Sequence, residues 1–143
     1  MIDLLPGVNS TAGALDAERV RMDVISQNIA NVNTTHGPDG KPYQRQHVVF
    51  ETVLQQVRDG VMSNVTEPVR VSHIAKDSRP AKLVYSPGHP DADSEGMVAM
   101  PDINLHEEMV DLIAASRTFE ANLAVMKNAK ALALQTLTIG RRS

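Results

Sequence analysis

The residues best suited to chemistry form an acidic segment from Asp91 to Asp102. Its carboxylates stand at the first, third, fifth and twelfth positions of a calcium loop of the EF-hand type, and Gly96 stands at the sixth. However, Pro101 stands where the second helix of such a hand would already run, and the preceding segment 83–90 contains two prolines and a glycine. A calcium-responsive module at 91–102 is therefore an alternative, and a solvated acidic loop is the preferred interpretation.

Other catalytic and binding patterns are weak. The five histidines show no pair at a metal-ligand spacing, and the chain contains no cysteine. No phosphate-binding loop, dinucleotide fingerprint or nucleophile elbow occurs in the sequence. A net charge of −3 disfavours nucleic acid as a partner, because neutralising phosphates requires a basic surface. The sequence thus predicts a protein that is not an enzyme and has no cofactor and no metal.

The strongest structural pattern is a long C-terminal helix, expected from Asn104 to about Ile139. Asn104 precedes Glu107 as in a capping box, and Gly140 stands where a left-handed residue would end the helix. Apolar residues recur every seven positions at Leu105, Leu112, Phe119, Met126 and Ala133. A second series, four residues further on, holds Met109, Ser116, Leu123 and Leu137, and the positions between them hold Ala115, Asn122, Ala129 and Thr136. This repeat predicts a coiled-coil-like seam.

A second helix is expected near the N-terminus, from Ser10 to Val32, with Ser10 or Thr11 as its N-cap. Its apolar positions are Leu15, Met22, Ile25, Ile29 and Val32. Asn28 and Asn31 lie beside this stripe, although Asn is unfavourable inside a helix. Either they cap a fraying helix end, or their amides pair across an interface and fix its register.

The middle of the chain has strand composition. Three short runs, 46–50, 68–74 and 81–85, are predicted strands, and the segment 51–65 could be helix or strand. The expected fold is α+β, with long N- and C-terminal helices that form a coiled-coil-like pair and a small β-rich insert between them. The expected divisions are 1–37, 38–101 and 102–143. The helix pattern fits a hairpin within one chain and a seam between chains equally well.

Several motifs resemble a known family. Residues 26–34, Ser-Gln-Asn-Ile-Ala-Asn-Val-Asn-Thr, look like the N-terminal signature of flagellar rod and hook proteins, and the run 108–113 with 117–122 is similar to their C-terminal helix. The segments 42–51 and 88–101, together with the chain length, resemble the short proximal rod members of that family. Met97 stands where the family usually has an aromatic residue, and Phe119 where Tyr is usual.

The resemblance implies a structural subunit of the proximal rod that polymerises through its terminal helices into part of a torque-transmitting drive shaft. Implied partners are other rod subunits, further copies of the chain, adjacent basal-body components and the flagellar type III export apparatus. The implied location is the periplasmic rod, reached without a cleaved signal peptide and without membrane insertion. A soluble coiled-coil adaptor is a further alternative.

The expected assembly interface combines the stripes of both helices. Its residues are Leu15, Met22, Ile25, Asn28, Ile29, Asn31, Val32, Leu105, Met109, Leu112, Phe119, Asn122, Leu123 and Met126.

Overall fold

A computed structural model describes residues 6–51 and 69–140 of the chain. Two helices and two β-hairpins follow one another in the order α1, β1, β2, β3, β4, α2. The helices are α1 (Pro6–Ala30) and α2 (Leu105–Gly140), and the strands are β1 (Gln46–Glu51), β2 (Arg70–Lys76), β3 (Lys82–Tyr85) and β4 (Met97–Met100). The α+β prediction is confirmed. Apart from Glu51, which ends β1, the undecided segment 51–65 lies outside the described residues.

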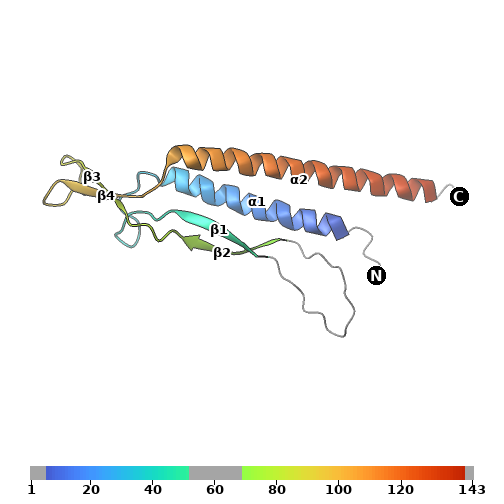
Figure 1. Cartoon of the computed structure of the whole chain (residues 1–143), viewed down its shortest axis with the longest axis horizontal. Coiled ribbons are helices and arrows are strands. Elements are labelled where there is room, and N and C mark those ends of the chain that lie inside the picture. Colours follow the sequence, from blue (N-terminus) through green and yellow to red (C-terminus); the bar gives the residue numbers. More distant parts are fainter. Residues whose placement is uncertain (1–5, 52–68, 141–143) are drawn as a thin grey trace, which may run out of the picture.

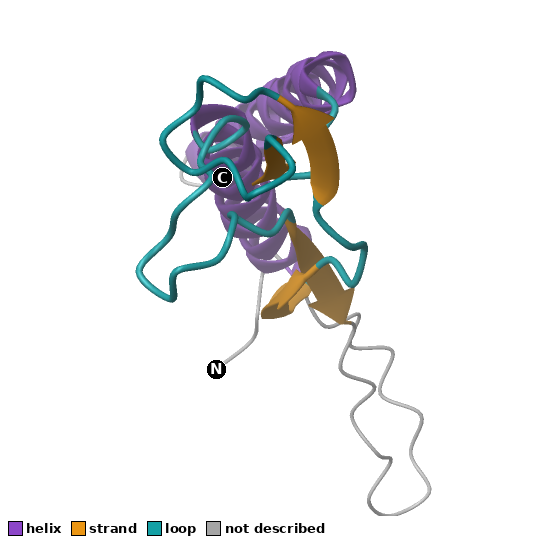
Figure 2. Ribbon diagram, turned by 90° about the vertical axis from the view of Figure 1, so that its left-hand side faces the viewer, coloured by secondary structure: helices purple, strands orange, loops and turns teal. Residues whose placement is uncertain are grey.

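The elements form three layers, with α1 in the middle (Figure 1). On one side α1 packs against α2, which runs antiparallel to it, and on the other side it packs against the β1–β2 hairpin. The β3–β4 hairpin lies at the end of the molecule where α1 ends and α2 begins, together with the connecting loops (Figure 2). The last residue of α2, Gly140, lies at the opposite end.

The start of α1 differs from the sequence expectation, whereas the start of α2 agrees with it. The N-terminal helix begins at Pro6, so Ser10 and Thr11 lie inside it and do not cap it. Proline suits the first helical position because that residue has no intrahelical use for an N–H group. Asn104 does cap α2, since its Oδ1 accepts the N–H of His106 at 3.1 Å. The Glu107 carboxylate meets the side-chain amide of Asn104 at 3.1 Å.

The predicted C-cap at Gly140 is wrong, because this residue is the last one of α2. Positive φ angles among the described glycines occur at Gly40 and Gly96. The strand Met97–Met100 was not predicted, and it pairs antiparallel with β3. The run Met-Val-Ala-Met is short and does not alternate polar with apolar residues, so its periodicity does not indicate a strand.

The β1–β2 pair contains a bulge, at which Val49 pairs with His73 and Phe50 with Val71. One extra residue on β2 therefore stands opposite the step between Val49 and Phe50, which increases the local twist. This hairpin covers α1 on the side that α2 leaves open. The core is small, and its buried apolar side chains are Ala17, Val24, Ile25, Val98 and Ala115.

Candidate assembly surface

The inner face of α2 packs against α1 along the predicted seven-residue repeat. Leu112, Phe119, Met126 and Ala133 are half-buried, and Ala115 is fully buried. Asn122 and Ala129 continue the line of Ala115. Among the described elements, α1 is the one that α2 packs against. Small residues at these positions let the two helices approach closely, so the seam forms a hairpin within the chain.

The buried face of α1 is displaced from its predicted stripe. Ala17, Val24, Ile25 and Asn28 are the buried positions of α1, while Leu15, Met22 and Ile29 are only half-buried. A single stripe describes a helix with one partner, whereas α1 has α2 on one side and the β1–β2 hairpin on the other. The half-buried Val32 follows the helix.

The remaining predicted interface residues lie on α2. Leu105 and Met109 are exposed, and Leu123 is half-buried. The structure thus places most of the predicted residues in or beside the α1–α2 contact. Their role in contacts between chains stays a prediction.

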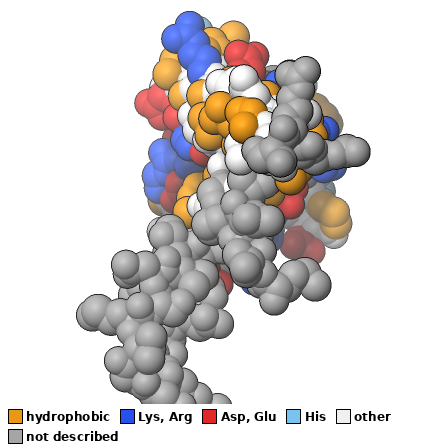
Figure 3. Space-filling view, turned by 90° about the vertical axis from the view of Figure 1, so that its right-hand side faces the viewer, with side chains coloured by type: hydrophobic (Ala, Val, Ile, Leu, Met, Phe, Trp, Pro, Cys, Tyr) orange, Lys and Arg blue, Asp and Glu red, His pale blue; other side chains and the backbone are white. Residues whose placement is uncertain are grey.

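Exposed apolar side chains that nothing in the described structure covers lie along the outer side of α2 and at its C-terminal end, where Leu137 continues the seam series. Each of the following is more than half exposed: Val110, Ile113, Val125, Leu132, Leu134, Leu137 and Ile139. Val125, Leu132 and Ile139 are seven residues apart and therefore lie on one face of the helix. Figure 3 looks onto the end of the molecule where α2 finishes and shows hydrophobic side chains gathered there.

A second feature missed by sequence reasoning is a buried polar cluster between α1, α2 and the start of β1. Nδ2 of Asn28 donates to Oε2 of Glu108 at 3.0 Å and to the carbonyl oxygen of Gln46 at 2.8 Å. Oδ1 of Asn28 accepts from the N–H of Gln46 at 2.9 Å and from the hydroxyl of Tyr43 at 3.1 Å. The amide of Asn28 therefore uses both of its ends within the chain.

The carboxylate of Glu108 is 1% exposed and needs a positive partner. Arg45 supplies it, because its Nε lies 2.6 Å from Oε1 of Glu108. Arg45 also reaches Asp111 one turn further along α2, at 3.8 Å. Burial, and secondly the charge of Glu108, raises the pKa of the Tyr43 phenol. The cluster thus joins three elements by charge-assisted hydrogen bonds.

The sequence contained a signal for this cluster. Glu108 stands seven residues before Ala115, so it belongs to the inner face of α2. A carboxylate at a seam position requires a buried partner. The partners come from α1 and from the loop before β1, far away in sequence, and periodicity does not identify such distant residues.

Asn31 caps the end of α1, which is the other interpretation of the asparagine pair. Its Nδ2 donates to the carbonyl oxygen of Gln27 at 2.8 Å, and its Oδ1 accepts from the hydroxyl of Thr34 at 3.1 Å. These bonds satisfy a carbonyl of the last turn of α1 and hold the following loop. Asn28 pairs across an interface, and Asn31 caps a helix end.

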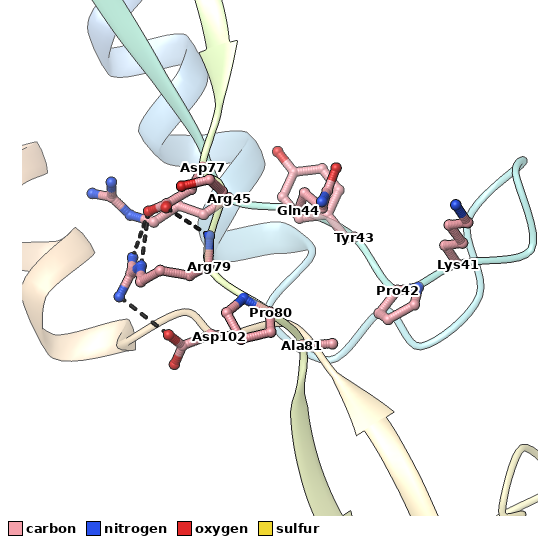
Figure 4. Close-up of a pocket in the computed structure, with 11 residues that line it drawn as sticks. Lys41, Pro42, Tyr43, Gln44, Arg45, Asp77, Arg79, Pro80, Ala81 and Asp102 are labelled. Carbon is pink, nitrogen blue, oxygen red and sulfur yellow. Dashed lines mark hydrogen bonds and ion pairs between the residues drawn. The ribbon is translucent and has the colours of Figure 1, made fainter.

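A cavity of about 240 Å³ lies between residues 41–45, residues 77–81 and Asp102 (Figure 4). Three of its charged groups, Asp77, Arg79 and Asp102, are paired with one another. Arg79 lies 2.8 Å from Asp77 and 3.2 Å from Asp102, and this pairing joins the β2–β3 connection to the start of α2. Hydrogen bonds from the backbone N–H and the guanidinium of Arg79 lower the pKa of the Asp77 carboxyl. The ion pairs of Arg79 therefore have a structural role, because they hold the β2–β3 connection to the residues before α2.

The acidic segment 91–102, which resembles a calcium loop, covers the second half of the β3–β4 connection, β4 itself and the two residues after it. Oδ1 of Asp93 accepts the N–H groups of Glu95 and Met97, both at 2.9 Å. The carboxylate of Asp91 accepts from the Thr35 hydroxyl at 2.7 Å. Within 6–51 and 69–140, no three histidine or acidic side chains converge in a way that could hold a metal ion. The geometry therefore favours a turn held by its own side chains.

Comparisons with known proteins point to one family. Residues 9–38 match the family described as "Flagella basal body rod protein", and residues 94–139 match "Flagellar basal body rod FlgEFG protein C-terminal". Three relatives are each named "Flagellar basal-body rod protein FlgC". The one from Borreliella burgdorferi is 42% identical over 95% of this chain and 97% of its own length.

The second relative, from Salmonella typhimurium, is 39% identical over 90% of this chain and 91% of its own length. The third, from Bacillus subtilis, is 38% identical over 94% and 96% respectively. No helix in the described part of the chain is long and apolar enough to cross a membrane.

Proposed function

The chain belongs to the FlgC family of flagellar basal-body rod proteins, and from this premise we propose that it is a structural subunit of the rod that assembles through the outer face of α2. The observation that carries this proposal is the row of exposed apolar side chains along that helix. The inner face of α2 is occupied by α1 of the same chain, so the outer face remains for neighbouring subunits.

The energetics favour a partner for this face. Burying one large aliphatic side chain stabilises a contact by about 1.5–3 kcal/mol. The face repeats such side chains from Val110 to Ile139. A monomer that remained free in water would rarely expose an apolar row of this kind, because such patches mark interaction sites. A helix of 36 residues is about 54 Å long, which gives neighbouring subunits an extended surface for packing.

The positions of the residues distinguish those that stiffen the subunit from those that contact neighbouring subunits. The α1–α2 seam and the cluster around Asn28 make one stiff unit, and Leu105, Met109 and Leu123 extend the surface that the outer face of α2 presents. We expect residues 1–37 and 102–143 to carry most contacts between subunits. Stiffness within each subunit is what transmission of torque requires.

The partners follow from the same proposal. The subunit contacts other rod components and further copies of itself, and the type III export apparatus delivers it to the periplasmic rod without cleaving a signal peptide. A chain with no cysteine and a small core suits export in an unfolded state, because no disulfide has to be broken and little apolar surface has to be exposed.

The test introduces a charge on the outer face. Val125→Lys is produced as the sole copy in a flagellated cell, with Glu120→Gln on the same helix as the matched control. We expect Val125→Lys to abolish swimming and to be missing from isolated basal bodies, whereas Glu120→Gln behaves as the parent. Circular dichroism of the purified variants should show equal helix content, because residue 125 is exposed in the subunit. Normal swimming of Val125→Lys would contradict the proposal.

A further inference from the structure

The β3–β4 hairpin has one apolar face turned outward. Val84 and its partner Val98 face inward, and Val98 is fully buried. Leu83 and Tyr85, on the opposite face of β3, are 62% and 69% exposed. They stand opposite Ala99 and Met97 of β4, so the four side chains share one face of the hairpin.

A complementary surface lies at the other end of the molecule. Asn28 near the end of α1 faces Glu108 near the start of α2, and α1 is eleven residues shorter than α2, as 36 minus 25 shows. Residues 131–140 of α2 consequently extend past α1 (Figure 1). In this projecting end Leu132, Leu134, Leu137 and Ile139 are all more than half exposed.

The β3–β4 connection and the C-terminal half of α2 carry opposite charges. The connection between β3 and β4, residues 86–96, contains Asp91, Asp93 and Glu95 and no lysine or arginine. The last twenty residues of α2, 121–140, contain Lys127 and Lys130 and no acidic residue. Opposite potentials orient two surfaces as they approach each other and select against the wrong pairings.

The two surfaces of one chain lie at opposite ends of its long axis, so they do not meet within one molecule. A contact between unlike surfaces of two copies is heterologous, and repeating it extends an assembly along its axis. Both ends expose apolar side chains, and their charges are complementary. A second copy of the chain is therefore the partner that fits each end.

We propose that the projecting end of α2, residues 131–140, packs on the outward face of the β3–β4 hairpin of a second copy, with Lys127 and Lys130 directed toward its acidic connection. This inference rests on the proposed function, since it supplies a head-to-tail contact for the assembly. It adds a specific role for Leu83 and Tyr85, which become the receiving surface for a neighbouring helix.

The absence of cysteine from the chain permits a direct test by cross-linking. Two single variants, Tyr85→Cys and Leu137→Cys, are produced together in one cell as the sole copies, and isolated basal bodies are oxidised mildly. The control pair is Ser72→Cys with Leu137→Cys, because Ser72 is an exposed residue of β2 outside the proposed contact. Leu83→Cys with Leu134→Cys provides a second pair at the same surfaces. Mixed disulfides are identified by mass spectrometry of the linked peptides.

The expected result is at least about tenfold more mixed disulfide for both test pairs than for the control pair, because a formed contact holds the two thiols at a high effective concentration. Basal bodies that contain the variants but yield no excess of mixed disulfide would overturn the inference and leave the rod function intact. An excess of disulfides between two copies of Tyr85→Cys would also overturn it. Absence of the parent chain from basal bodies of swimming cells would remove the proposed function itself.

Discussion

Nδ2 of Asn28 on α1 lies 3.0 Å from Oε2 of Glu108 on α2, and both side chains are 1% exposed. The contact joins residues 80 positions apart in the sequence. It sets the register of the helix pair at the end where the chain turns toward the strands, because a buried amide that fails to meet its partners loses several hydrogen bonds at once. Apolar packing further along the seam has no comparable specificity.

Replacement of Asn28 by alanine should therefore be costly. The variant leaves Glu108, Tyr43 and the backbone of Gln46 without a shared partner, and we expect a loss of about 2–4 kcal/mol in the free energy of unfolding. The matched control is Asn31→Ala, whose bonds lie at the exposed end of the helix and should be worth about 1 kcal/mol or less. Urea unfolding followed by circular dichroism measures both. Equal losses would show that Asn28 has no special role.

Arg45 should matter because it neutralises a buried charge. Arg45→Met keeps much of the side-chain length and removes the guanidinium that lies 2.6 Å from Glu108. An unpaired buried carboxylate costs about 3–5 kcal/mol, and this loss should shrink in the double variant Arg45→Met with Glu108→Gln, in which neither member of the buried pair is charged. The comparison is a double-mutant cycle in urea. Additive losses in the double variant would contradict a direct pairing.

The outline of the fold follows from local patterns. The seven-residue repeat from Leu112 to Ala133 predicted the inner face of α2, and the composition of three runs predicted three of the four strands. The same repeat did not decide between a hairpin and a seam between chains. The small residues Ala115 and Ala129 permit close approach to any helix, whether it belongs to the same chain or to another.

Sequence periodicity could not predict the polar cluster around Asn28 and Glu108. The side chain of Arg45 comes from a loop, and loops have no repeat that indicates a partner. The end of α2 also differs from the expectation, since Gly140 remains helical although glycine often ends a helix. The helix-propensity penalty of glycine is only about 1 kcal/mol, which does not by itself end a helix.

The seam should not tolerate a larger residue at Ala115. This side chain is fully buried between the helices, so Ala115→Leu overpacks the contact, and we expect a loss of about 1–3 kcal/mol. Ala114→Leu is the matched control, because residue 114 is its exposed neighbour and leucine is a good helix former. Thermal unfolding of the two variants checks this. A stable Ala115→Leu variant would mean that the helices separate easily in the subunit.

The ionisation of Tyr43 should report on the cluster. Burial is the larger cause that raises its pKa, and the charge of Glu108 is the smaller one. Tyr43 is protonated more readily when folded, so its contribution to stability is complete below about pH 10, the ordinary value, and is lost as the pH rises through the raised value. Absorbance titration in a Tyr85→Phe background isolates this phenol. Glu108→Gln should lower the pKa of Tyr43 but leave it above that of a tyrosine peptide. If the pKa of Tyr43 already equals the peptide value in the Tyr85→Phe protein with Glu108 intact, the burial of this phenol is contradicted.

Gly96 should be irreplaceable where β4 begins. Its φ angle is +75°, in the left-handed region that side chains with a Cβ rarely adopt. A Cβ at this position would also lie 3.1 Å from Cβ of Pro87 and 3.1 Å from Cε2 of Tyr85. Gly96→Ala therefore combines backbone strain with a steric conflict, and we expect it to cost about 1–3 kcal/mol.

Gly88→Ala is the matched control in the same connection, because a Cβ there meets no atom within 4 Å and its φ lies outside the left-handed region. It should change stability by no more than about 0.5 kcal/mol. The hairpin packs at one end of the subunit, so the strain of Gly96→Ala should also shift Tyr85 on the proposed receiving face. In Gly96→Ala, amide hydrogen exchange should therefore accelerate relative to the parent protein more at the N–H groups of β3 and β4 than at those of α2. Uniform acceleration across the whole chain would instead indicate global destabilisation without a local effect at the hairpin.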